Sequence, residues 1–105
     1  MYNLEINKSA FRIFRKLPPD VKLEIWNKAQ KLRDNPLLGE SLKGMSPRLR
    51  ALHLSFKGTQ YRIIYQVFPQ TSTIIIRLAD KRENIYKKLE EIGNSNFTHG
   101  QRIRA

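Results

Sequence analysis

The sequence predicts an α+β domain: a small antiparallel sheet with an N-terminal helical hairpin and a C-terminal helix, in the order β-α-α-β-β-β-α. Three patterns indicate this class. Apolar residues recur at helical spacing through residues 10–33, they alternate in period two through residues 49–68, and a continuous apolar run follows at residues 74–76. The length of 105 residues suits one domain with a single modest core.

The first elements are a short strand and two helices. Residues 2–6 alternate between apolar and polar side chains, which is typical of a strand. Ser9 is expected to cap a helix over residues 10–17, which two consecutive prolines end. A second helix, with one apolar stripe, is expected from about residue 19 to about residue 33. The short link between them predicts that the two helices pack as a hairpin.

The second half of the chain predicts three strands and a helix. A loop rich in proline and glycine precedes them. The strands are expected at residues 49–56, 61–68 and 73–79, with turn-forming residues between them. The last helix is expected over residues 82–92, with Asp80 as its cap. Helices on one face of such a sheet leave its other face at least partly exposed.

The chain divides into a folded part and a tail. Residues 1–93 carry all the predicted elements, and Gly93 ends the last helix. Residues 94–105 are polar and basic without periodicity, which predicts a flexible C-terminal tail.

The charge of the chain is strongly positive. Twenty Lys and Arg oppose nine Asp and Glu, a net charge of +11. Residues 42–88 hold ten basic and two acidic residues, or +8, whereas residues 1–41 hold eight and five, or +3. Such a field favours polyanions, so a nucleic-acid or ribosome partner is expected, with its binding surface in the second half.

Several classes of protein are disfavoured by composition. The chain has no cysteine, which excludes disulfides and thiolate metal sites and is compatible with a reducing cytoplasm. It shows neither a signal-peptide pattern nor an apolar run of the ~20 residues that span a membrane, so a cytoplasmic protein is expected. The scattered acidic residues show no metal-ligand spacing and no glycine-rich phosphate loop occurs, so no metal or cofactor is expected.

Arg62 is the first candidate site residue. It stands in the middle of a predicted strand, where a cation is costly unless it faces solvent or an anion. It suits either an exposed arginine or cross-strand ion pair, or a phosphate clamp, because guanidinium presents a planar fork of donors.

Two further candidates lie on the last predicted helix and one on a strand. Arg82 and Tyr86 are four residues apart, so they share a helix face, and Arg82 is near the helix N-terminus, where anions are favoured. Each also suits a structural role, with Arg82 as a surface charge and the Tyr86 ring packed on the core. His53, on the open face by strand alternation, suits either a general base or acid or an ordinary polar position.

Five other cations could add electrostatic attraction with little discrimination between sequences. Lys81 precedes Arg82 and is also an alternative proton carrier. The other four are candidates for RNA binding: Lys43, Arg48, Arg50 and Lys57.

Three segments resemble the RelE/ParE superfamily of toxins from bacterial type II toxin–antitoxin modules. They are Leu42-Lys43-Gly44-Met45, Tyr61-Arg62-Ile63-Ile64-Tyr65-Gln66-Val67 and Lys81-Arg82-Glu83-Asn84-Ile85-Tyr86. The predicted order of elements also agrees, so the resemblance covers the chain to about Ile92. It implies that residues 1–93 form a RelE-like toxin domain that a cognate antitoxin protein holds inactive in a hetero-oligomer.

The first two segments are more similar to the RelE branch, whose members cleave mRNA in the ribosomal A site. The resemblance then implies that Arg62 contacts the scissile phosphate, that Arg82 is the second active-site arginine and that Tyr86 stacks on or orients a base. The implied reaction is metal-independent: the mRNA 2′-hydroxyl attacks the adjacent phosphate, and His53, or alternatively Lys81, moves the proton.

The chain departs from the RelE pattern on the strand before the hairpin. Relatives carry basic residues there, whereas alternation puts Ala51 and His53 on the open face, and Arg50 could replace them only if a bulge shifted the register. Two alternative functions stay open: a ParE-like poison of DNA gyrase without nuclease activity, and a non-toxic nucleic-acid-binding module.

Overall fold

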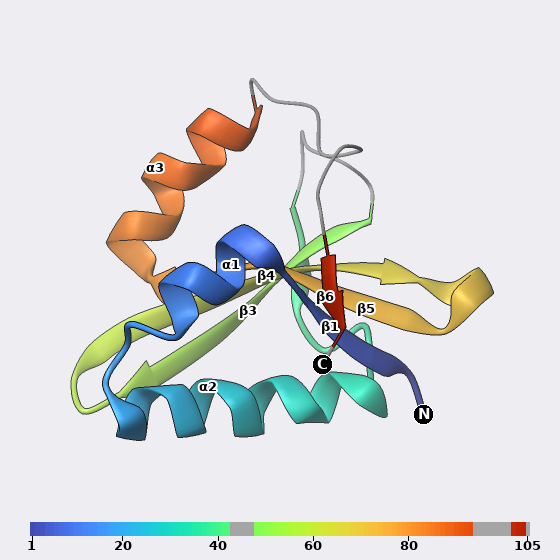
Figure 1. Cartoon of the computed structure of the whole chain (residues 1–105), viewed down its shortest axis with the longest axis horizontal. Coiled ribbons are helices and arrows are strands. Elements are labelled where there is room, and N and C mark those ends of the chain that lie inside the picture. Colours follow the sequence, from blue (N-terminus) through green and yellow to red (C-terminus); the bar gives the residue numbers. More distant parts are fainter. Residues whose placement is uncertain (43–47, 94–101, 105) are drawn as a thin grey trace.

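A single mixed sheet forms the centre of the protein (Figure 1). The computed structural model describes residues 1–42, 48–93 and 102–104. Its strands are β1 (Asn3–Asn7), β2 (Glu40–Ser41), β3 (Leu49–Phe56), β4 (Thr59–Phe68), β5 (Thr73–Lys81) and β6 (Arg102–Arg104), in the spatial order β2-β3-β4-β5-β1-β6. The long strand β5 is buried along almost its whole length, as its run of three isoleucines predicts.

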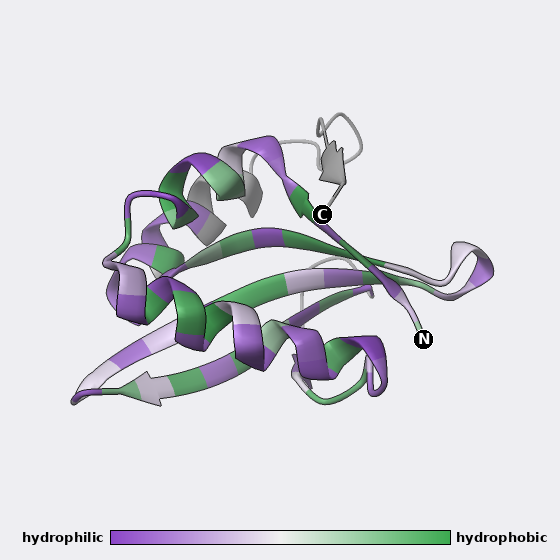
Figure 2. Cartoon of the chain, turned by 60° about the horizontal axis from the view of Figure 1, so that its bottom comes forward, coloured by the Kyte–Doolittle hydropathy of each residue, from purple (hydrophilic) through white to green (hydrophobic). Residues whose placement is uncertain are grey.

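Two helices cover one face of the sheet. They are α1 (Lys8–Phe14) and α2 (Pro19–Gln30), and a 3₁₀ turn over Lys31–Arg33 extends α2. Pro19 opens α2, where its missing N–H costs nothing. The helices meet at the rings of Phe14 and Trp26, whose centroids are 6.4 Å apart. Figure 2 shows both helices lying along the sheet, with apolar and polar residues alternating along each.

The third helix, α3 (Arg82–Gly93), follows β5 without a break. The Asp80 carboxylate binds groups at the start of α3. Its Oδ1 accepts a hydrogen bond from the backbone N–H of Lys81 at 2.7 Å, and its Oδ2 accepts one from the Asn84 side-chain amide at 3.2 Å. Ile85 of α3 packs on the second face of the sheet, in a small apolar cluster with Leu49, Ala51, Ile64 and Leu78.

The two faces of the sheet therefore differ in how much apolar packing covers them. The larger cluster, between the sheet and α1 and α2, holds most of the buried apolar side chains, among them Ile25, Ile63 and Tyr65. The smaller cluster covers only part of the second face, and next to it the strand residues His53 and Arg62 stay accessible. This accessible strip is where the sequence predicts a site.

The hairpin of β3 and β4 fixes what this strip contains. Lys57 and Gly58 form a two-residue turn with φ of 49° and 77°, as the tight hairpin turns require. From it the ladder runs without interruption, from Phe56 opposite Thr59 to Leu49 opposite Gln66. His53 is consequently paired directly with Arg62.

The predicted α+β class and order of the main elements are confirmed, with several differences in detail. Strand β2 lies in the segment that was expected to be a loop. The sheet is not purely antiparallel, because β1 pairs with β5 in parallel. The first helix begins at Lys8, not Ala10, and its cap is Asn7, whose Oδ1 accepts from the Ser9 N–H at 2.8 Å. Helix α3 lies on the second face, whereas one covered face was expected.

A further difference concerns the tail. Residues 102–104, within the segment expected to be a flexible tail, pair antiparallel with β1 at the edge of the sheet. The rest of the predicted tail, residues 94–101 and 105, lies outside the described residues, and the division at residue 93 stays a prediction.

Within the described ranges, no helix is long and apolar enough to cross a membrane.

Candidate functional site

His53 and Arg62 form the centre of the candidate site. They lie opposite each other on β3 and β4, on the face away from α1 and α2. The guanidinium Nη1 of Arg62 hydrogen-bonds to Nδ1 of His53, and the histidine side chain remains 45% exposed. A cross-strand cation and an imidazole are thus held together by the backbone ladder, open to solvent.

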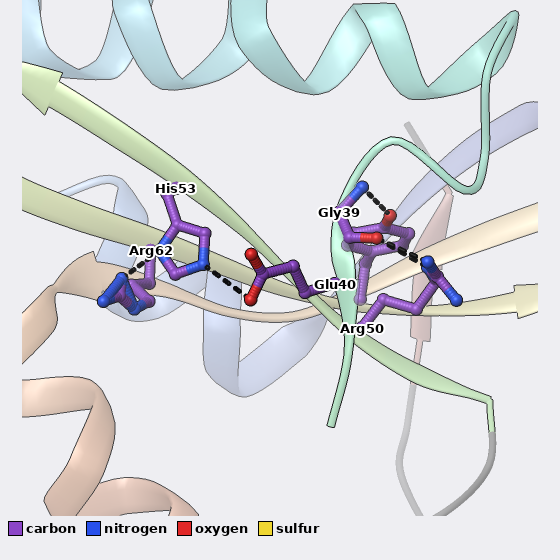
Figure 3. Close-up of polar contacts among 6 residues, drawn as sticks. Gly39, Glu40, Arg50, His53 and Arg62 are labelled. Atoms are coloured by element: carbon purple, nitrogen blue, oxygen red, sulfur yellow. Dashed lines mark hydrogen bonds and ion pairs between the residues drawn. The ribbon is translucent and has the colours of Figure 1, made fainter. Parts of the chain in front are cut away.

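A carboxylate lies on the other side of His53 from Arg62, toward the edge of the sheet. Glu40, on the short strand β2, places Oε2 3.7 Å from Nε2 of His53. Figure 3 shows the imidazole between the two charged groups, with Arg62 on one side and Glu40 on the other. We call these three residues the histidine row.

Glu40 owes its place to a clamped loop. The buried Tyr65 hydroxyl donates to the carbonyl of Pro36 at 2.8 Å and accepts from the N–H of Gly39 at 2.9 Å. The Arg50 guanidinium binds the Gly39 carbonyl from the same side of the sheet, with Nε at 2.9 Å. Both backbone groups of Gly39 are therefore fixed, and the next residue starts β2 beside His53 (Figure 3).

Burial raises the pKa of the Tyr65 hydroxyl, even though its hydrogen bond with Gly39 and the nearby Arg50 oppose that shift. The hydroxyl is thus kept protonated, as its donation to Pro36 requires.

Arg82 stands at the start of α3, on the other side of Arg62 from His53. Asp80 is paired with Arg62 in the ladder, and Arg82 follows two residues later. Lys81 and Arg82 line a shallow cleft of about 290 Å³ together with Glu83 and residues 58–60 of the hairpin. An anion near the cleft would meet cationic side chains and a helix N-terminus together.

Lys81 lies on a different face of the sheet from His53 and Arg62. In the ladder it pairs with Tyr61, a residue of the helix-covered core, whereas Arg62 pairs with Asp80. Strand alternation thus directs Lys81 to the other face of the sheet. His53, and not Lys81, therefore shares a face of the sheet with Arg62.

The other predicted residues are dispersed. Arg50 and Tyr65 hold the loop at Pro36 and Gly39, and we call these contacts the loop clamp. Arg50 lies on the helix-covered face, and the uninterrupted ladder shows that no bulge in β3 turns it toward His53. Arg48 is exposed and lies 5.2 Å over the ring of Phe68. Tyr86 lies in α3, but its side chain is outside the described residues, as is all of Lys43.

Lys57 is engaged at the hairpin tip. Its Nζ lies 2.8 Å from Oδ2 of Asp20 at the start of α2. The hydrogen bond between them lowers the pKa of Asp20 and raises the pKa of Lys57. Both side chains are exposed, so the pair adds little to stability.

Sequence reasoning missed Glu40 and the loop clamp. Glu40 stands in a segment with neither helical nor strand periodicity, so its position in the fold could not be inferred. A single acidic residue in so basic a chain also gives no motif that would mark it as part of a site. The neighbouring Gly39 carried the only signal, because a glycine in a loop can mark a close backbone approach. Among the described residues, no three His, Asp or Glu side chains gather as a metal site would require.

Comparison with known proteins identifies the family of this domain. A model of the "ParE-like toxin of type II bacterial toxin-antitoxin system" family matches residues 4–90. No curated protein sequence matches significantly.

Among solved structures, the isolated Escherichia coli RelE toxin is similar, with a TM-score of 0.68 and 23% identity over 88% of this chain and 98% of that chain. The intact E. coli RelBE toxin–antitoxin complex gives 0.67 and 26%, covering 77% and 96% of the respective chains. The complex RelBE2 from Mycobacterium tuberculosis gives 0.64 and 26%, covering 77% and 91%.

Proposed function

This chain belongs to the ParE-like toxin family of bacterial type II toxin–antitoxin systems, and on that basis we propose that it is a ribosome-dependent endoribonuclease of the RelE kind. It would cleave mRNA in the ribosomal A site, stop translation, and be neutralised by a cognate antitoxin in a cytoplasmic hetero-oligomer. The match to both isolated RelE and RelBE complexes supports this direction.

One observation carries the proposal: Arg62 and His53 lie side by side on an accessible face, next to the start of α3. A cation that binds phosphate and a group that can move a proton are the two minimal parts of a metal-independent ribonuclease. A toxin that acts only by binding a protein surface needs no such pair.

The proposed reaction begins when the mRNA 2′-hydroxyl attacks the adjacent phosphate. His53 takes the hydroxyl proton, while Arg62 and Arg82 stabilise the charge that develops on the phosphorane. The products are a cyclic phosphate and a 5′-hydroxyl end. Tyr86 would hold a base, and the ribosome would supply the alignment of the RNA, so little cleavage of free RNA is expected.

The alternative is a gyrase poison of the ParE kind, which the name of the matching family keeps in view. The two functions predict different lesions. Induction of the chain alone, with mapping of mRNA 5′ ends and of DNA breaks in the same cells, separates them. Cuts in phase with the ribosomal A site support the nuclease, and gyrase-dependent DNA breaks without such cuts would refute it. Harmless expression of the folded chain would instead favour a non-toxic nucleic-acid-binding module.

Substitutions test the assignment of the site. We expect Arg62→Ala and Arg82→Ala each to relieve growth arrest and to reduce A-site cuts at unchanged protein level, because each removes a phosphate contact. Ile75→Ala, in the buried strand β5, provides the control for instability, with an expected loss of ~2–5 kcal/mol in the free energy of unfolding. Full toxicity in both arginine variants would show that the site lies elsewhere.

A further inference from the structure

The contacts of the histidine row define which ring nitrogen of His53 carries the proton. Guanidinium nitrogens only donate hydrogen bonds. Because Nη1 of Arg62 points at Nδ1 of His53, that nitrogen must be the acceptor. The proton of a neutral ring then resides on Nε2, which faces the carboxylate of Glu40 at 3.7 Å. The opposite tautomer would set donor against donor on one side and lone pair against carboxylate on the other.

In this arrangement His53 has no nitrogen free to accept a proton. Its Nδ1 lone pair is used by Arg62, and Nε2 already bears hydrogen. We propose that Arg62 masks the base in the free chain, that a substrate phosphate unmasks it, and that Glu40 is a positioning residue that holds the ring in the Nε2–H tautomer. This inference rests on the proposed function, because it specifies how the same site is switched on.

A phosphate can draw Arg62 away because it is the stronger partner. Hydrogen bonds between guanidinium and phosphate join opposite charges and are often bidentate, whereas Nδ1 of His53 offers one neutral acceptor. Arg62 is only half-buried, so its guanidinium is within reach of an incoming anion. The group that fixes the phosphate thus releases the base only when the phosphate is present.

In the chemical step one bond to phosphorus forms and one breaks. The 2′-oxygen forms its bond to phosphorus, the bond from phosphorus to the 5′-oxygen breaks, and the 2′-hydroxyl proton passes to Nδ1. The 5′-oxygen leaves with a proton from solvent water, and the imidazolium later returns its own proton to solvent. During the step the Nε2–H still faces Glu40, whose negative charge stabilises the positive ring.

The tautomer can be measured on the purified full chain. Long-range proton–nitrogen correlation of the imidazoles at pH 8 should show His53 as the Nε2–H form with an acceptor Nδ1. A His53→Gln variant assigns its signals against those of His99. Addition of a short RNA with 2′-O-methyl groups, which cannot be cleaved, should shift the Nδ1 resonance as Arg62 leaves it.

Two carboxylate variants sharpen the test. Once the methylated RNA has drawn Arg62 away from Nδ1, Glu40→Gln should give a mixture of both tautomers, and it should reduce the rate of A-site cleavage several-fold, with the affinity for the methylated RNA unchanged. Glu24→Gln, on α2 at the covered face, should change neither. The proposal is overturned if the free chain shows the Nδ1–H form, if the methylated RNA binds without moving the Nδ1 resonance, or if the RNA-bound Glu40→Gln variant keeps a pure Nε2–H ring. If A-site cuts persist together with any of these contradicting spectra, the proposed function stands and only this switch is refuted. If His53 shows the Nε2–H form but no A-site cuts occur, the nuclease function itself is refuted.

Discussion

At the scale of single residues, Gly39 shows how closely the candidate site is fitted to the backbone. A Cβ at this position would lie 2.6 Å from the Ala51 carbonyl oxygen and 2.8 Å from the Tyr65 hydroxyl. Neither atom can move easily, because the first belongs to the sheet ladder and the second is fixed by two hydrogen bonds. The side-chain hydrogen of glycine is therefore a requirement for Glu40 to reach His53.

We expect Gly39→Ala to lower the free energy of unfolding by ~1–3 kcal/mol, the usual cost of overpacking, and to reduce toxicity by displacing Glu40. Urea denaturation measures the first effect and growth after induction the second. Gly58→Ala is the matched control, because a Cβ there meets open space and only the positive φ of 77° is strained, which costs ~1–2 kcal/mol. Equal loss of toxicity in both variants, at equal stability, would argue against a special role of Gly39.

At the scale of elements, the loop clamp connects the core to the histidine row. Tyr65 projects from β4 into the helix-covered core, yet its hydroxyl holds the segment that carries Glu40. The strand itself and its neighbour β3 were predicted from their alternation, and β5 was predicted from its continuous apolar run. The hydroxyl contact was not predictable, because it joins residues 26 positions apart through a loop without periodicity.

Removal of this hydroxyl should have an effect that depends on pH. At neutral pH, Tyr65→Phe leaves the buried Gly39 N–H without its acceptor, and we expect a loss of ~1–3 kcal/mol. Because the folded-state pKa of Tyr65 is raised, its contribution is complete below the ordinary tyrosine value of about 10 and is lost as pH rises through the folded value. The stability gap between parent and variant should therefore narrow above pH 10 in denaturation curves, and a constant gap would contradict the assigned shift.

The register of the β3–β4 hairpin marks the limit of what the sequence could predict for the site. Alternation placed His53 and Arg62 on the open face, and the tight turn at Lys57 and Gly58 makes them direct neighbours. Their mutual hydrogen bond and the carboxylate beside them depend on side-chain positions across three strands, which no local pattern encodes. The roles of Arg62, His53, Arg82 and Tyr86 all stay predictions.

At the scale of the whole molecule, the net charge of +11 should dominate encounters with RNA. Affinity for single-stranded RNA should fall with salt, with a slope of about −0.7 per phosphate contact in a plot of log K against log salt. Arg62→Ala should reduce the magnitude of that slope by about 0.7. Arg50→Ala should leave the slope unchanged, because its guanidinium binds the Gly39 carbonyl. Equal slopes for the parent and Arg62→Ala, measured by fluorescence anisotropy, would show that Arg62 does not contact phosphate.

The global arrangement was predictable only in part. Charge, length and the order of elements indicated a small basic α+β domain. The resemblance of three segments indicated a toxin, and the family match confirms that family. The parallel pairing of β1 with β5 was not predictable, because it joins segments about 70 residues apart and depends on the covering helices. The same is true of β6, whose three residues are too few to show a period.

Strand β6 also affects which backbone groups at the edge of the sheet are open to another chain. A strand at the margin of a sheet offers unpaired N–H and C=O groups to any passing chain, and natural proteins cover or interrupt such margins. Here the chain covers the free side of β1 with its own last residues, two arginines around one isoleucine, while at the far margin β2 spans only two residues. A protein trimmed to residues 4–90, the part that matches the family model, would expose that side of β1.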